Sequence, residues 1–256
     1  MNKAIVLSSG GVDSTTCVGL AVKELGANNV ITVSVLYGQR HSREIECADK
    51  VAKYYGLRHE VLDLSPIYKY SNCSLLAQST QEVPEGDYAS QINKSDTGVV
   101  ATYVPNRNAL MLNAVAALGL SIFPNDNVQI WLGAHSDDAA GNAYPDCSQK
   151  FTDMMGAAIS EGTDGQVSLV APLVNMNKAQ VVASGLAIEV PYQLTTSCYN
   201  GGECACANCG TCIDRILAFK TNRVIDPITY GVHVDWSGCN KIGYLLDAYK
   251  EAEANA

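Results

Sequence analysis

Hydrophobic residues in this chain form short runs, separated by segments whose apolar positions recur at helical spacing. The runs predict buried strands, since most of them are rich in β-branched residues. They cover residues 4–7, 30–36, 59–64, 128–132 and 167–170. The amphipathic segments predict helices over residues 17–25, 42–55, 109–120, 148–159, 176–186 and 213–220, the first of them opened by Asp13 and Ser14. Good helix formers predict a terminal helix over residues 242–256. This alternation predicts an α/β fold, with a parallel sheet, right-handed crossovers and helices on both faces.

A glycine loop joins the first predicted strand to the first helix. It runs from Ser8 to Ser14 with the sequence Ser-Ser-Gly-Gly-Val-Asp-Ser. Glycine allows backbone N–H groups to approach an oxyanion, and a helix N-terminus adds unpaired donors and a partial positive charge. The loop has neither the Gly-Lys-Ser/Thr ending of a Walker A loop nor the G-x-G-x-x-G pattern. It therefore predicts a phosphate-binding site of another kind.

The composition is that of an ordinary globular protein, with 47% apolar and 17% charged residues. A length of 256 residues fits one large domain, or one domain with a small appendage. The net charge is −9 and the 17 Lys and Arg form no dense cluster, which argues against a nucleic acid partner. The N-terminus has no signal-peptide pattern, and no apolar run is long enough to span a bilayer. We therefore expect a cytoplasmic protein with no membrane partner.

Cysteines are concentrated toward the C-terminal end, where five of the ten lie between residues 198 and 212. In a reducing compartment, such a cluster favours metal binding over disulfides. Cys198, Cys206, Cys209 and Cys212 can place four thiolates around one tetrahedral Zn²⁺, a closed shell that is typical of structural sites. Cys204 is an extra thiol that either replaces Cys206 or stays free. An iron–sulfur cluster is the alternative, but nothing else in the sequence suggests redox chemistry.

Five ordered blocks of sequence resemble the motifs of one family. Ser9–Ser14 resembles the S-G-G-x-D-S loop of the PP-loop ATP pyrophosphatases. The other blocks are Tyr37–Ile45, Val104–Asn108, Tyr144–Cys147 and the segment from Cys198 to Arg215. Together they resemble the QueC family of 7-cyano-7-deazaguanine synthases over nearly the full chain. The resemblance implies a Rossmann-like PP-loop fold, with an ATP-binding domain at residues 1–190 and a zinc-binding loop and helical region at residues 191–256.

The same resemblance implies roles for individual residues. ATP is expected to bind Ser8, Ser9, Gly10, Gly11, Val12, Asp13, Ser14, Thr15 and Thr16. The expected catalytic residues are Asp13, Ser14, Arg107 and Lys178. The substrate is expected to bind Gln39, Arg40, His41, Asp137, Tyr144 and Asp146, with Asp146 recognising the base and Asp138 as the alternative to Asp137. Mg²⁺ is expected to accompany ATP, and a structural Zn²⁺ to bind the four cysteines.

The implied reaction is the ATP-dependent conversion of 7-carboxy-7-deazaguanine and ammonia to 7-cyano-7-deazaguanine (preQ0), a step of queuosine biosynthesis. It passes through an acyl adenylate and an amide and releases AMP and pyrophosphate, which makes the enzyme a ligase that forms C–N bonds.

Two departures from the family pattern leave other functions open. The gap between Cys198 and Cys206 is shorter than in common members of the family. The segment between Gly133 and Cys147 is longer than in those members, and residues 139–143 account for the difference. The alternatives are a QueC-like ligase that joins the activated acid to another amine, such as a protein N-terminus, a PP-loop enzyme that modifies tRNA, and a non-catalytic nucleotide-binding module. A homodimer is also compatible with the sequence.

Overall fold

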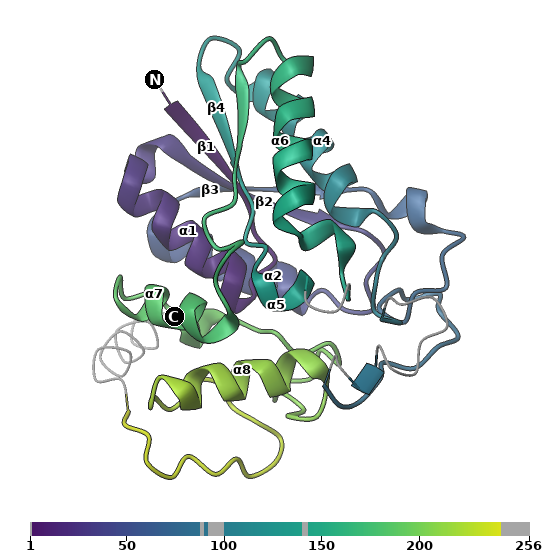
Figure 1. Ribbon diagram of the computed structural model, residues 1–256, viewed down its shortest axis with the longest axis vertical. Helices are drawn as coiled ribbons and strands as arrows, with labels where there is room; N and C mark the ends of the chain where they lie inside the picture. The colour runs from purple at the N-terminus through teal and green to yellow at the C-terminus, as the bar shows by residue number, and fades with distance from the viewer. Residues whose placement is uncertain (1, 88–89, 92–99, 140–142, 242–256) are drawn as a thin grey trace.

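A five-stranded parallel sheet with the strand order β3-β2-β1-β4-β5 forms the centre of the molecule (Figure 1). The computed structural model describes residues 2–87, 90–91, 100–139 and 143–241. Its strands are β1 (Asn2–Leu7), β2 (Val30–Leu36), β3 (Arg58–Asp63), β4 (Asn127–Trp131) and β5 (Val167–Val170). Every neighbouring pair is parallel, as the predicted α/β fold requires.

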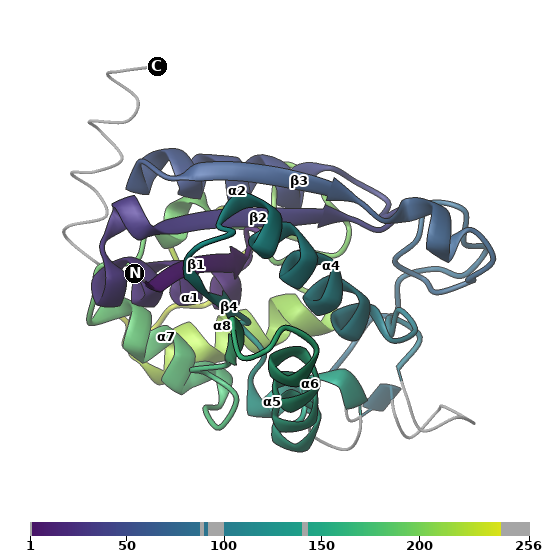
Figure 2. The same ribbon diagram turned by 90° about the horizontal axis from the view of Figure 1, so that it is seen from above.

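Helices cover both faces of the sheet because successive side chains of each strand point to opposite sides. On β1, Ala4 and Val6 pack against α1 (Val12–Leu25), whereas Ile5 and Leu7 face the other side. The first face also carries α2 (Arg43–Tyr55), α7 (Lys178–Leu186) and α8 (Gly210–Thr221). The second face carries α4 (Arg107–Ile122) and α6 (Gln149–Gly162), as Figure 2 shows from above. The short pieces are α5 (Ser136–Ala139), η1 (Ala27–Asn29), η2 (Ser65–Tyr68), η4 (Pro145–Cys147) and η5 (Tyr192–Leu194).

The strand order reverses between β1 and β4, and this reversal positions the functional site. The chain moves outward from β1 to β3 and then returns to place β4 on the other side of β1. The loops that follow β1 and β4 diverge at this point and leave a crevice at the carboxyl edge of the sheet. Gly133, just after β4, lies so close to the loop after β1 that a Cβ would be 3.1 Å from the Asp13 carbonyl carbon and oxygen.

The predicted elements agree with the structure, apart from some of their ends. The bounds predicted for β2 and β5 are confirmed, and α1 begins at Val12, next to the Asp13 and Ser14 that were expected to open it. A helix expected over residues 242–256 lies outside the described residues. Within the described part of the chain, no helix has both the length and the apolar character needed to cross a membrane.

The segment after residue 190 packs onto the same hydrophobic core as the sheet. Phe219 of α8 is fully buried, and its ring lies edge-on to that of Tyr192, with 5.4 Å between the centroids. Arg215, one turn earlier on α8, is 1% exposed and forms an ion pair with the buried Asp226. The guanidinium donates to both Asp226 oxygens, at 2.6 and 2.9 Å, and Tyr230 donates a third hydrogen bond, at 2.6 Å. This ion pair holds the segment that follows α8, around Asp226, against that helix.

Replacing Asp226 with Asn would leave the Arg215 guanidinium buried without its counter-charge. Breaking a buried ion pair from one side typically costs roughly 3–5 kcal/mol, so we expect the free energy of unfolding to fall by that amount. Urea denaturation measures the loss, and Asp235→Asn, at an exposed position, is the matched control. A fall in the free energy of unfolding of less than about 1 kcal/mol is typical of exposed ion pairs. Such a result would contradict the stabilising role of the Arg215–Asp226 pair.

Candidate functional site

A cavity of ≈ 220 Å³ lies at the carboxyl edge of the sheet, at the reversal of strand order. Its walls come from the loop after β1, the first turns of α2 and α4, the segment after β4, the start of α7, and residues 196–199. Charged and polar side chains share these walls with apolar ones such as Leu75, Met111 and Leu132. A concave site with an apolar lining and a few polar groups is suited to a small-molecule ligand.

The glycine loop forms one wall of the cavity. Helix α1 begins after Gly11 without a side-chain cap, so the N–H groups of its first turn are left for a ligand. The Ser14 hydroxyl accepts a hydrogen bond from the Ser9 amide at 3.2 Å and donates to the Gly11 carbonyl at 3.3 Å, which holds the loop closed. The Ser8 hydroxyl is buried beside the cavity and has no hydrogen-bond partner among the described residues. These donors suit an anion such as a phosphate.

A charged cluster lies beside this loop. Lys178, the first residue of α7, is 7% exposed, and its Nζ lies 2.5 Å from Asp13 Oδ2. Burial lowers the pKa of Lys178, but Asp13 more than offsets this and the net pKa is raised, so the lysine stays charged. Burial raises the pKa of Asp13, but Lys178 and His135 outweigh it and the net pKa is lowered. His135 Nε2 lies 3.3 Å from Lys178 Nζ and 3.4 Å from Asp138 Oδ2, which links the end of β4 to the cluster.

A second cation, Arg107, lines another part of the cavity. Its guanidinium lies over the ring of Tyr37, with 5.0 Å from the guanidinium carbon to the ring centroid. Burial lowers the pKa of Arg107, but its neighbours Tyr37 and Asp146 more than offset this, so the net pKa is raised. The cavity therefore presents two cations, the buried Lys178 beside the glycine loop and the partly exposed Arg107 at the start of α4.

The structure brings nine of the predicted site residues together around this cavity. They are Ser8, Ser9, Gly11, Asp13, Ser14, Gln39, Arg107, Tyr144 and Lys178. Three other residues of the predicted ATP-binding set point into the protein. Val12 packs in the core, the Thr16 hydroxyl is 2.7 Å from that of Tyr192, and Thr15 is fully buried.

Four predicted substrate-binding residues are placed in hydrogen bonds within the protein and are not among the described residues that line this cavity. The Arg40 guanidinium donates to the carbonyls of Ser74 and Gln81, and His41 Nε2 lies 3.2 Å from the Tyr199 carbonyl oxygen. The Asp137 carboxylate accepts from the Lys178 amide at 2.7 Å, at the start of α7. The Asp146 carboxylate accepts from the Asn108 amide at 3.0 Å, at the start of α4. Their predicted contacts with substrate remain predictions.

Several cavity residues were not singled out from the sequence. Thr196, Ser197 and Tyr199 come from the segment before Cys198, and Asp214 comes from α8. Burial raises the pKa of the Asp214 carboxyl to about 6, and Lys178 only partly opposes this effect. Tyr199 and Asp214 lie in the block of residues 198–215 that resembles the family motif, but hydrophobic periodicity does not show which of these four side chains reach the cavity.

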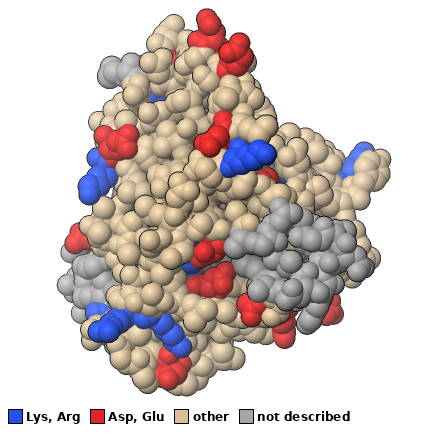
Figure 3. Space-filling model, viewed as in Figure 1, with Lys and Arg blue, Asp and Glu red and all other residues tan. Residues whose placement is uncertain are grey.

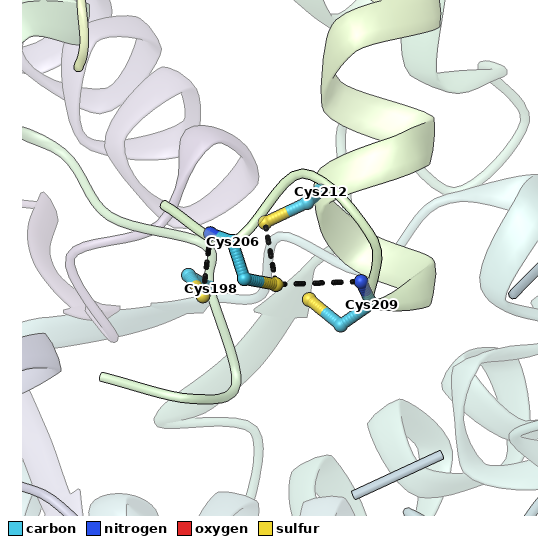
Figure 4. A group of neighbouring side chains, drawn as sticks. All are labelled: Cys198, Cys206, Cys209 and Cys212. Carbon is cyan, nitrogen blue, oxygen red and sulfur yellow. Dashed lines mark hydrogen bonds between the residues drawn. The ribbon is translucent and has the colours of Figure 1, made fainter. Parts of the chain in front are cut away.

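Four cysteines form a separate cluster next to this wall (Figure 4). The sulfur atoms of Cys198, Cys206, Cys209 and Cys212 lie within 4.8 Å of one another. This is close to the ~3.8 Å separation of thiolates around a tetrahedral Zn²⁺ with bonds of ~2.3 Å. The Cys206 amide donates to Cys198 Sγ and the Cys209 amide to Cys206 Sγ, both at 3.4 Å, as thiolate ligands require. Cys204 is exposed and lies outside this group, whereas Cys206 belongs to it.

Charged side chains are sparse on the face of the molecule shown in Figure 3. The described Lys and Arg side chains there are few and dispersed, with uncharged residues between them.

Comparison with known proteins gives one family. The family model "Queuosine biosynthesis protein QueC" matches residues 3–223. A "7-cyano-7-deazaguanine synthase" of Caldicellulosiruptor saccharolyticus is 38% identical over 234 residues, which are 91% of this chain and 98% of the relative. The protein of the same name from Archaeoglobus fulgidus is 35% identical over 99% of this chain and 100% of its own length. Among solved structures, NMN synthetase from Francisella tularensis superposes with a TM-score of 0.45 at 17% identity, over 78% of this chain and 67% of that one.

Replacing Cys209 with Ala should release bound zinc and destabilise the protein, because metal binding to such a cluster is coupled to folding. Zinc per chain is measured by plasma mass spectrometry and stability by thermal unfolding. Cys204→Ala, at the exposed thiol outside the cluster, is the control and should retain both. A folded Cys209→Ala protein that keeps the wild-type unfolding temperature without zinc would contradict the structural role of the site.

Proposed function

The chain belongs to the QueC family of queuosine biosynthesis proteins, and we propose that it makes 7-cyano-7-deazaguanine from 7-carboxy-7-deazaguanine, ammonia and ATP. The observation that carries the proposal is the similarity to enzymes named 7-cyano-7-deazaguanine synthase along almost their full length. The chain is an enzyme of this family, and within the proposal it is a ligase that forms a C–N bond in the first half of its reaction.

The chemistry explains why ATP is needed. A carboxylate is a poor electrophile, so one of its oxygens first attacks the α-phosphorus of ATP and pyrophosphate leaves. Ammonia then attacks the carbonyl carbon of the acyl adenylate, AMP leaves, and loss of a proton gives the amide. The amide oxygen attacks the α-phosphorus of a second ATP and a second pyrophosphate leaves. Elimination of AMP from this adenylated amide, with loss of two protons in all, gives the nitrile. Both activations need a site that holds a triphosphate in line with one oxygen of the substrate.

In this proposal the glycine loop and Lys178 hold the pyrophosphate portion of ATP. The open N-terminus of α1 and the unpartnered Ser8 hydroxyl supply donors, and the Lys178 ammonium supplies positive charge. Preorganised donors of this kind stabilise the charge that develops on a departing pyrophosphate. Asp13 keeps Lys178 charged and in place through the ion pair between them.

Arg107 is the candidate partner of the substrate carboxylate. A guanidinium presents parallel N–H donors that match the two oxygens of a carboxylate, and its enclosed position strengthens the interaction. The apolar walls around it restrict water, which would otherwise hydrolyse an acyl adenylate.

Two metal ions belong to the proposal. Cys198, Cys206, Cys209 and Cys212 would hold Zn²⁺ in a closed shell that stabilises the fold and leaves no open position for substrate. Asp138 lines the cavity, and Asp13 Oδ1 has no hydrogen-bond partner among the described residues, so both offer the carboxylate oxygens that Mg²⁺ prefers. When bound with ATP, Mg²⁺ would neutralise phosphate charge.

The experiment that tests the proposal is mass spectrometry of a reaction with zinc-loaded protein, 7-carboxy-7-deazaguanine, ATP, Mg²⁺ and ammonium. The nitrile should appear together with AMP and pyrophosphate. An adenylate or amide that goes no further would favour a different amine acceptor. The absence of AMP would contradict the proposal.

Replacing Lys178 with Met should slow pyrophosphate release by roughly 100-fold, the effect of removing one preorganised donor from an anion site. Release is followed with a coupled pyrophosphatase assay at saturating substrates. Lys150→Met, which removes an exposed lysine from the first turn of α6, is the control and should retain the wild-type rate. An equal rate in both variants would show that Lys178 does not act on the phosphates.

A further inference from the structure

The Glu44 carboxylate is a charged group of the cavity wall that the mechanism above does not use. It belongs to the first turn of α2 and lines the cavity together with Tyr37 and Arg107. It has no hydrogen bond or ion pair with any residue that the structure describes. Burial raises the pKa of this carboxyl, although His41 and Arg107 oppose the effect. The Glu44 side chain is partly buried, and a carboxylate that loses part of its water needs other hydrogen-bond donors. A ligand in the cavity that brings such donors would supply them.

The position of Glu44 is fixed relative to the glycine loop. Gly10 has a φ of +73°, and a Cβ at this residue would lie 2.4 Å from the Glu44 backbone carbonyl oxygen. The start of α2 therefore rests directly on the loop, and another side chain at Gly10 would push the two apart. Because of this contact, one rigid unit carries both the anion-binding loop and the carboxylate.

The neighbours of Glu44 suit a flat, polar ring. The Tyr37 ring, with the Arg107 guanidinium over it, and the side chains of Leu75 and Met111 supply planar and apolar surface. The pyrimidine edge of a guanine-like ring carries an N–H group next to an amino group, both donors. The two oxygens of the Glu44 carboxylate can accept these two hydrogen bonds. The positive Arg107 guanidinium suits the 7-carboxylate on the other side of the same ligand.

We propose that Glu44 selects the base of the substrate, by accepting hydrogen bonds from the N–H and 2-amino groups of the deazaguanine ring. This inference rests on the proposed function and deepens it. Asp146, the acid expected from the sequence to recognise the base, already accepts the Asn108 amide at the start of α4. Asp13 and Asp138 already interact with Lys178 and His135, beside the part of the glycine loop where the phosphates are placed.

The test compares two ligands, 7-carboxy-7-deazaguanine and its analogue without the 2-amino group. Isothermal calorimetry without ATP gives both dissociation constants, and steady-state assays give the KM for ATP. The wild type should prefer the guanine-like ligand by roughly 10- to 100-fold, the range for a bidentate pair. Glu44→Gln should reduce this preference to about 3-fold or less. The glutamine side chain keeps one acceptor, its carbonyl oxygen, but its NH₂ group would face the second N–H donor of the ligand. The KM for ATP should not change.

Control variants separate base recognition from folding. Glu46→Gln removes an exposed carboxylate from the same helical turn and should retain the full preference. Glu44→Asp keeps the carboxylate and should bind more weakly while still preferring the 2-amino ligand. An unchanged preference in Glu44→Gln would overturn the inference. If Glu44→Gln does not fold, the wild-type protein still tests the inference. Equal binding of the two ligands by the wild type would overturn it. Failure of the wild type to bind 7-carboxy-7-deazaguanine would instead overturn the proposed function.

Discussion

The ion pair between Asp13 and Lys178 connects the two halves of the sheet at the point where the site forms. Asp13 follows the central strand β1, and Lys178 follows β5, the edge strand next to β4. His135, after β4, is 1% exposed and touches both partners, so three loops meet at one charged cluster. Burying the Lys178 ammonium without a counter-charge would cost a large desolvation free energy. The neighbouring Asp13 carboxylate offsets most of this cost. The pair therefore keeps a cation beside the glycine loop, ready for an anionic ligand.

The cysteine cluster serves the same site from the other side. Cys198 ends the segment that carries Thr196 and Ser197 into the cavity wall, and the Thr196 amide donates to the Gly10 carbonyl at 2.9 Å. Arg215, on the helix that begins beside Cys209, donates to the hydroxyl of Thr195 at 2.9 Å. A metal in the cluster would thus hold the cavity wall as well as the C-terminal helix. In the proposed function, a bound Zn²⁺ would stabilise the shape of the site without taking part in the chemistry.

The accuracy of the sequence interpretation depended on how local each signal was. The residues of β2 are a continuous β-branched run, and its ends were predicted correctly because nothing outside the strand decides them. The close approach of the four cysteine sulfur atoms follows largely from local sequence, because three of these cysteines lie within seven residues of chain, from Cys206 to Cys212. The start of α1 was predicted at Asp13 and Ser14, next to the observed Val12, because the Ser, Gly and Asp residues that mark it are adjacent in the sequence. The partners of Asp146 and Glu44 depend on contacts between distant segments, which no periodicity reveals.

In the proposed reaction, ATP held by the glycine loop transfers its AMP group to a carboxylate oxygen of the substrate. The most direct measurement uses 7-carboxy-7-deazaguanine labelled with ¹⁸O in both carboxylate oxygens and follows the label by mass spectrometry. If the carboxylate and then the amide attack the α-phosphorus, each AMP released should carry one ¹⁸O from the substrate, and the nitrile should carry none. Unlabelled AMP, or label in inorganic phosphate with ADP as the product, would contradict the account.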